Sequence, residues 1–307
     1  MRSSTKLVSL AIALACASAA QAQQVFKIGH VGPVSGPNAH LGKDNENAAR
    51  MAVDELNSKG FTINGQRVTL QLLAEDDASD PKQGTAVAQT LVDAKVNGIV
   101  GHLNSGTSVP ESRIYHNAGL VQVSPATTAT LFTKQKFPGV LRVVANDARL
   151  GGTLGRYAVE TLKVKNIAVI DDRTTYGQGV AAEFSRGAKG PGVRIVDKQF
   201  TTASATDFTA ILTAIRAKKP DLIFFGGMDA VAGPMLKRMR ALGIEARFMG
   251  GDGMCTEALG RLRRQAHAHA HGCDPLARLQ RYQRSVETNV SRAPRCAQPS
   301  CSSIGAG

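Results

Sequence analysis

The chain has 307 residues, of which 43% are hydrophobic and 5% aromatic, and it carries a formal net charge of +13. This length suffices for two lobes of ordinary size with a sizeable core. The charge does not indicate a nucleic-acid-binding protein, because such proteins gather basic residues and stacking aromatics on one face. Here eight Arg residues and only two acids, Asp274 and Glu287, lie from Arg261 onward, and the body interleaves bases with acids.

The first residues have the pattern of a cleavable export signal. Arg2 and Lys6 precede an apolar run at 7–17, and Ala20-Gln21-Ala22 is a small-x-small cleavage site. The run is shorter than the roughly 20 apolar residues that a membrane-spanning helix needs. We therefore predict a signal peptide over residues 1–22 and a mature chain in the periplasm. Export favours solute capture over nucleotide chemistry, because ATP and NAD are scarce outside the cytoplasm.

Hydrophobic patterning up to residue 142 predicts alternating strands and helices. Short apolar runs bounded by turn residues are typical of buried strands, and a 3.6-residue repeat is typical of an amphipathic helix. The expected strands are 26–31, 68–73, 98–100, 120–123 and 140–144. The expected helices include 42–59, with Ala48, Met51, Ala52 and Leu56 on its apolar face, and a second one that carries Val87, Ala88, Leu91 and Val92.

The same alternation begins again after residue 143. Strands are expected at 166–170, 193–196, 222–225 and 247–250, and helices at 177–189, 208–215 and 235–242. Two successive strand–helix–strand series indicate an α/β protein with two Rossmann-like lobes and mainly parallel sheets. We assign residues 23–142 to lobe 1 and residues 143–262 to a partial lobe 2.

Residues 263–307 depart from this pattern. They contain no strand-like run and no sustained helical stripe, and they are rich in Ser, Gln, Pro and Arg. His267, His269 and His271 alternate with Ala, so a metal-binding tail is one interpretation. The abrupt loss of Lys and of periodicity favours the other interpretation, a disordered or frame-shifted end.

The sequence lacks the motifs of the common catalytic sites. It has no G-x-x-x-x-G-K-[ST] phosphate loop and no G-x-S-x-G elbow, and Gly29, Gly32 and Gly36 do not have the dinucleotide-binding spacing. His30 and His102 each end an expected strand, and we interpret them as polar residues at the mouth of a cleft. We therefore expect no enzyme, no catalytic residue, no cofactor and no metal site.

Hydroxyl and acidic side chains follow three expected strands, at the strand ends where open α/β sheets bind ligands. Segments 101–107 and 124–128 contain Ser105 and Thr128, and they offer hydroxyls and helix N-terminal N–H groups to a carboxylate. Asp252 follows a strand in lobe 2 and is placed to pair with an ammonium. This arrangement fits an α-amino acid zwitterion. The alternative is that Ser105 and Thr128 only cap helices.

Six motifs resemble those of the periplasmic branched-chain amino acid binding proteins, the receptors of leucine/isoleucine/valine ABC importers. The motifs are 28–36, 76–83, 101–103, 124–127, 176–177 and 225–227, and the resemblance covers residues 26 to about 262. It implies a type I periplasmic binding protein, a monomer whose two lobes close on a small ligand before it docks on a membrane permease.

The resemblance also implies a ligand site. Its positions are Ser105, Ala126, Thr128, Tyr176, Asp252, Met228 and Leu41. The first three would hold the ligand carboxylate, Tyr176 would lie at the cleft, and Asp252 would meet the α-ammonium. Leu41 and Met228 stand where aromatic residues often line the pocket, which leaves the choice of amino acid open. Some relatives have a disulfide at the positions of Ser79 and Asn104.

Two alternatives to a branched-chain amino acid receptor stay open. A receptor for amides, aromatic acids or other small metabolites would share the fold but would leave Asp252 without an ammonium to pair with. A non-functional truncated product is the second alternative, because relatives continue past residue 262 with further strands and helices.

Overall fold

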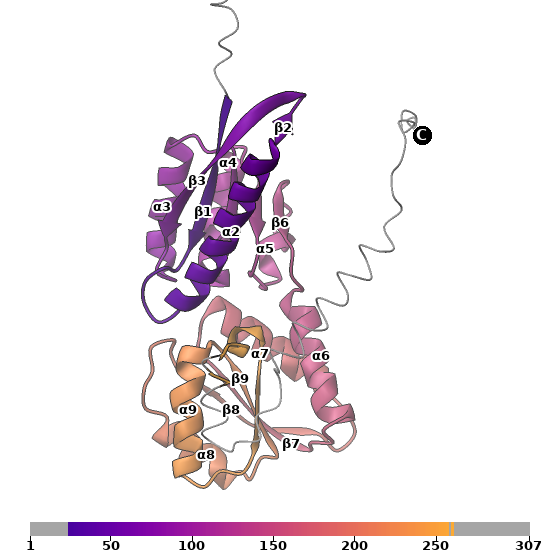
Figure 1. Cartoon of the computed structure of the whole chain (residues 1–307). Helices are drawn as coiled ribbons and strands as arrows, with labels where there is room; N and C mark the ends of the chain where they lie inside the picture. Colours follow the sequence, from indigo (N-terminus) through magenta and orange to yellow (C-terminus); the bar gives the residue numbers. More distant parts are fainter. Residues whose placement is uncertain (1–23, 258, 261–307) are drawn as a thin grey trace, which may run out of the picture.

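The computed structural model describes residues 24–257 and 259–260, and Figure 1 shows them as two lobes connected through α6 (Asp147–Glu160). The predicted signal peptide, residues 1–22, and the off-pattern tail, residues 263–307, lie outside these residues. Within the described ranges, no helix is long and apolar enough to cross a membrane. The same ranges contain no group of three His, Cys, Asp or Glu side chains arranged to hold a metal ion.

Lobe 1 contains a six-stranded sheet in the order β2-β3-β1-β4-β5-β6. Its strands are β1 (Gln24–Gly32), β2 (Thr62–Ile63), β3 (Gln66–Asp76), β4 (Gly98–Gly101), β5 (Gln122–Ser124) and β6 (Val140–Arg142). Every neighbouring pair is parallel except β2 with β3. The carboxyl ends of the parallel strands therefore lie along one edge, and this edge faces lobe 2 in Figure 1.

Lobe 2 contains a four-stranded, fully parallel sheet in the order β10-β9-β7-β8. Its strands are β7 (Asn166–Asp171), β8 (Arg194–Phe200), β9 (Leu222–Gly226) and β10 (Arg247–Gly250). Every residue of β9 is buried, as expected for an apolar run with helices on both faces of its sheet. The two sheets confirm the predicted α/β class.

Helices connect the strands in both lobes. Lobe 1 has α2 (Ala39–Lys59), α3 (Pro81–Asp93), α4 (Ser105–Asn117) and α5 (Leu131–Lys134). Lobe 2 has α6, α7 (Thr175–Gly187), α8 (Thr209–Ala217), α9 (Asp229–Ala241) and the short 3₁₀ helix η1 (Asp252–Met254). The periodicity of α8 is confirmed, since Leu212 and Ile215 are fully buried.

The predicted apolar face of α2 is wrong. Ala48, Met51, Ala52 and Leu56 are exposed, and 72% of Met51 is accessible to solvent. The orientation of α2 is instead set by Asn57, whose side chain donates to the carbonyl of Leu70 on β3 at 2.9 Å and accepts from its N–H at 2.8 Å. The hydrogen bonds of Asn57 to the β3 backbone, and not the apolar stripe, therefore determine which face of α2 packs against the sheet.

Helix α6 was not expected, because its buried face is made largely of glycine. Gly151 and Gly155 pack closely against α7. A Cβ atom on Gly151 would lie 2.7 Å from the Val180 carbonyl oxygen, and one on Gly155 would lie 2.4 Å from the Phe184 carbonyl oxygen. Glycine is a poor helix former and contributes no apolar stripe. Close backbone packing between α6 and α7 therefore replaces the side-chain pattern that marks an ordinary buried helix.

His30 and His102 do not lie at a cleft mouth, and that prediction is also wrong. Both side chains are fully buried. The His102 ring lies between the Asp77 carboxylate, at 2.8 Å from Nδ1, and the Tyr115 hydroxyl, at 2.9 Å from Nε2. Glu111 lies close to this group, and burial raises its pKa to about 8. This set of Asp77, His102, Glu111 and Tyr115, the buried polar cluster, ties α4 to the loop after β3.

Candidate functional site

Two neighbouring cavities lie between the lobes, and six of the seven predicted ligand residues line the smaller one. This first chamber has a volume of about 150 Å³. The predicted residues that line it are Leu41, Ser105, Ala126, Tyr176, Met228 and Asp252. They come from both lobes, so a molecule in this chamber would contact both.

On lobe 1, the chamber is formed by the turns that follow β4 and β5. Gly101 ends β4 with φ +141°, and a Cβ atom there would lie 2.4 Å from the Val31 carbonyl oxygen, so this turn requires glycine. Ser105 begins α4, and its hydroxyl accepts a hydrogen bond from the N–H of Ala129 at 3.2 Å. The hydroxyl therefore holds the turn after β5 beside the start of α4.

The helix-cap interpretation of Ser105 and Thr128 does not agree with the structure. Asn104 is the residue before α4, and Thr130 is the residue before α5. Ser105 is therefore the first residue of α4 and not its N-cap, and Thr128 precedes the N-cap position of α5 by two residues. Both hydroxyls are therefore placed by the loops and not by helix capping.

Thr128 is not among the residues that line either cavity. Its side chain is 2% exposed, and its hydroxyl lies close enough to the Asp147 carboxylate to lower the pKa of that group. The neighbouring residue in space is Asp147, whose N–H donates to the Thr128 carbonyl at 2.8 Å. Burial, and to a smaller extent the negative charge of Asp252, outweigh this effect of Thr128 and raise the pKa of Asp147 to about 6. The predicted contact between Thr128 and a ligand carboxylate stays a prediction.

On lobe 2, the chamber is formed by Tyr176 and η1. The Tyr176 hydroxyl donates to Asp252 Oδ1 at 2.9 Å and accepts from the N–H of Gly253 at 2.9 Å. Burial, and then the charge of Asp252, raise the pKa of this phenol well above its usual value. The tyrosine therefore stays neutral and orients a carboxylate at the edge of the chamber.

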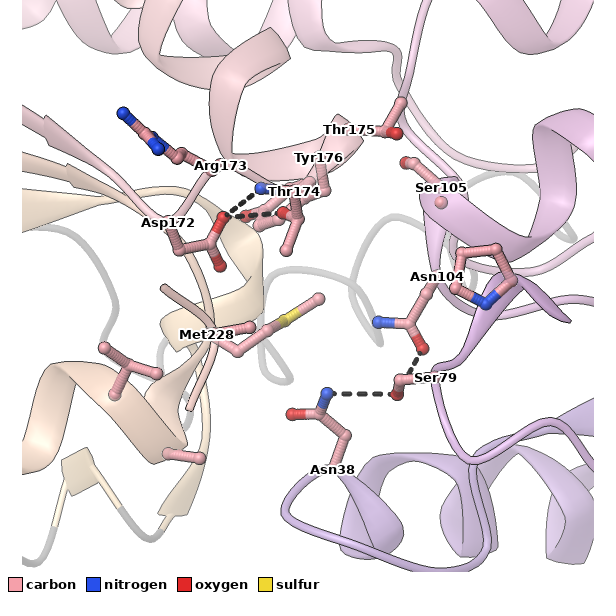
Figure 2. A pocket seen from close by; sticks show the side chains of 15 residues that line it. Asn38, Ser79, Asn104, Ser105, Asp172, Arg173, Thr174, Thr175, Tyr176 and Met228 are labelled. Carbon is pink, nitrogen blue, oxygen red and sulfur yellow. Dashed lines mark hydrogen bonds between the residues drawn. The ribbon is translucent and has the colours of Figure 1, made fainter. Parts of the chain in front are cut away.

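The second chamber was missed from the sequence. It has a volume of about 250 Å³ and shares Ser105, Tyr176 and Met228 with the first chamber. Figure 2 shows its two sides, with Asp172 and Thr174 on lobe 2 opposite Asn38, Ser79 and Asn104 on lobe 1. Asp172 and Thr174 come directly after β7, and this position at a strand end was a signal that could have found them.

Ser79 and Asn104, the two positions at which the resemblance implies a disulfide in some relatives, are in contact. The Ser79 hydroxyl donates to Asn104 Oδ1 at 2.9 Å and accepts from Asn38 Nδ2 at 3.1 Å. These three polar side chains form one wall of the second chamber. A hydrogen-bonded chain thus occupies the place that the resemblance gives to a cystine.

Comparisons with known proteins give a consistent result. The family model described as periplasmic binding protein matches residues 25–274. The chain is 36% identical over 254 residues to an amino acid binding protein of Pseudomonas aeruginosa, covering 82% of this chain and 67% of that protein. It is 33% identical to the leucine-specific-binding protein of Salmonella typhimurium, covering 85% and 70% respectively. It therefore spans about two thirds of the length of these relatives.

Solved structures show the same similarity. A branched-chain amino acid transporter substrate-binding protein of Streptococcus pneumoniae, in complex with isoleucine, superposes with a TM-score of 0.68 at 29% identity, covering 79% of this chain and 68% of that one. A leucine-binding protein of Thermotoga maritima superposes with a TM-score of 0.70 at 24% identity, covering 78% and 67%. The second likeness supports the fold alone.

Proposed function

The chain belongs to the periplasmic binding protein family, and we propose that it is an exported receptor that holds an α-amino acid between its lobes. Members of this family bind substrates and are not enzymes. In this proposal the receptor works as a monomer in the periplasm and delivers its ligand to the membrane permease of an ABC importer. The names of the relatives make leucine, isoleucine and valine the first ligands to test.

The observation that carries the proposal is the placement of opposite chemistry on the two sides of the first chamber. Asp252, held by Tyr176, contributes a carboxylate from lobe 2. Ser105, at the start of α4, and Ala126, in the turn after β5, lie on the lobe 1 side of the same cavity. An ammonium is stabilised by the first group, and a carboxylate by hydroxyls and helix N-terminal N–H groups. An α-amino acid carries both.

Contacts with both lobes also explain how binding would favour closure. A ligand shifts a conformational equilibrium only through contacts that differ between the two states. A zwitterion that pairs with Asp252 and with the loop of Ser105 makes both contacts only when the lobes are together. The ligand therefore stabilises the closed form that a permease would recognise.

Replacing Asp252 by Asn tests the ammonium contact. The amide keeps an oxygen for the Tyr176 hydroxyl and removes the charge. A charge-assisted hydrogen bond is worth about 1.5–3 kcal/mol, so we expect leucine affinity in isothermal titration calorimetry to fall by about 10- to 100-fold. The matched control is Asp93→Asn, which removes an exposed carboxylate at the end of α3 and should leave affinity unchanged.

A ligand without the ammonium tests the same contact from the other side. We expect 4-methylpentanoate, which is leucine without its amino group, to bind the unaltered chain at least tenfold more weakly than leucine. Equal affinity for the two compounds would favour a receptor for simple carboxylic acids, and leucine affinity that survives Asp252→Asn would contradict the assignment of Asp252.

A further inference from the structure

We infer that the second chamber holds the positively charged, hydrogen-bond-donating end of a ligand side chain, so that the preferred ligands are basic α-amino acids. This inference rests on the proposed function, because the first chamber must hold the α-amino and α-carboxylate groups. It goes beyond that function by assigning a site for the side chain and its chemistry.

Asp172 provides the negative charge of the second chamber. It follows β7, and its side chain is 2% exposed. One oxygen, Oδ1, accepts from the Thr174 N–H at 3.0 Å and from the Thr174 hydroxyl at 2.6 Å. The other oxygen, Oδ2, is buried and has no partner among the described residues. Figure 2 shows it on the side of the carboxylate where Met228 lies.

Asn38 provides a second acceptor from the opposite lobe. Its Nδ2 group donates to the Ser79 hydroxyl, and that hydroxyl donates in turn to Asn104. Because Asn38 Nδ2 is the donor in this series of hydrogen bonds, Asn38 Oδ1 remains as an acceptor. This oxygen is also buried, and it has no hydrogen-bond partner among the described residues. Asp172 Oδ2 and Asn38 Oδ1 are therefore unpaired acceptors on opposite walls of the chamber, and a ligand group with hydrogen-bond donors would satisfy both.

The charges around the chamber favour a cation over a neutral amide. The basic side chain among its lining residues is Arg173, whose guanidinium lies over the Phe200 ring, 3.4 Å from the centroid, and points away from Asp172 in Figure 2. Burial raises the pKa of Asp172, as expected for a carboxylate without a counter-charge. Buried polar groups in native proteins are almost always satisfied, and a ligand ammonium or guanidinium would satisfy this one.

The two chambers are adjacent, and their shared lining suits one elongated ligand. Each is smaller than the roughly 300 Å³ at the lower end of ordinary ligand pockets, and they share Ser105, Tyr176 and Met228. Met228 extends between the lobes in Figure 2, and the unbranched thioether of methionine adapts readily to a neighbouring chain. A ligand anchored at Asp252 would pass Met228 with its alkyl chain and reach Asp172 with its end group.

The test compares L-lysine with L-norleucine, which has the same straight side chain but lacks the terminal ammonium. Calorimetry on the full chain should give at least tenfold tighter binding of lysine. The Asp172→Asn variant keeps an oxygen for Thr174 and removes the charge, so lysine affinity should fall by about 10- to 100-fold, the range for one charge-assisted hydrogen bond. Norleucine affinity should change less than twofold, and the control Asp93→Asn, at an exposed position at the end of α3, should alter neither.

The outcomes separate this inference from the proposed function. Binding of norleucine or leucine equal to or tighter than that of lysine would overturn the inference and leave the amino acid receptor standing. No binding of any α-amino acid would overturn both. Thermal unfolding without ligand shows whether Asp172→Asn is folded. If it is not, Asn38→Ala replaces it in the same comparison, and an unchanged lysine affinity in that variant would overturn the inference.

Discussion

Replacing Glu111 by Gln should stabilise the chain near neutral pH and have no effect in acid. Glu111 lies on α4 with its side chain fully buried. One oxygen is 3.4 Å from the Thr85 hydroxyl, and the other has no partner among the described residues. Burial is the main cause that raises its pKa from 4.5 to about 8, and the nearby charge of Asp77 adds to it.

The size of the effect follows from the two pKa values. Between pH 4.5 and pH 8 the unfolded chain releases the Glu111 proton and the folded chain keeps it, so the free energy of unfolding falls as pH rises. Each pH unit corresponds to about 1.4 kcal/mol, which gives a loss of about 3 kcal/mol at pH 7 relative to acid. Glutamine has no proton to retain and nearly the same shape. It should raise the free energy of unfolding by about 3 kcal/mol at pH 7.

Differential scanning calorimetry at pH 4, 5.5 and 7 measures this dependence. For a chain of this size, 3 kcal/mol corresponds to a rise in Tm of about 6–12 °C. The rise should shrink at pH 5.5 and vanish at pH 4. Glu160→Gln, at an exposed position at the end of α6, is the control. A gain of the same size at all three pH values, or a loss at pH 7, would refute the reasoning.

Two further substitutions test the packing and the closure of the lobes. Gly42→Ala places a Cβ atom 1.9 Å from the Pro33 carbonyl oxygen, and urea unfolding should show a loss of about 3 kcal/mol, the upper end for overpacking; an unchanged midpoint would contradict this contact. His40 on α2 lies 2.9 Å from Asp229 at the start of α9, so His40→Ala removes a contact between lobes. Because His40 is 44% exposed, ligand dissociation in stopped-flow experiments should accelerate only a few-fold, and an unchanged rate would show that the contact does not stabilise the closed form.

The order of strands and helices could be predicted from the sequence because most elements depend on local apolar patterns. The helix of Leu212 and Ile215 and the strand Leu222–Gly226 are examples in which period and burial agree. The pattern fails where backbone or polar contacts decide the packing. The glycine face of α6 and the Asn57 side chain on α2 are such cases.

The first chamber of the candidate site could be predicted from the sequence, and the second chamber could not. Ser105 and Asp252 follow strands, and a general rule about parallel sheets places them at one cleft. The second chamber depends on which side chains from the two lobes face each other. Asn38 and Asp172 are 134 positions apart in the sequence, and no local pattern relates them. Their unpaired oxygens become visible only when every hydrogen bond around them is known.

The contact between Ser79 and Asn104 has a consequence for how the chain matures. A wall of the cleft built on hydrogen bonds forms as the lobe folds and needs no thiol oxidation. Residues 23–142 contain no cysteine, so the geometry of this lobe 1 wall is independent of oxidising enzymes and of the redox potential of the surroundings. Lobe 1 can therefore acquire its binding wall equally well in a reducing or an oxidising compartment.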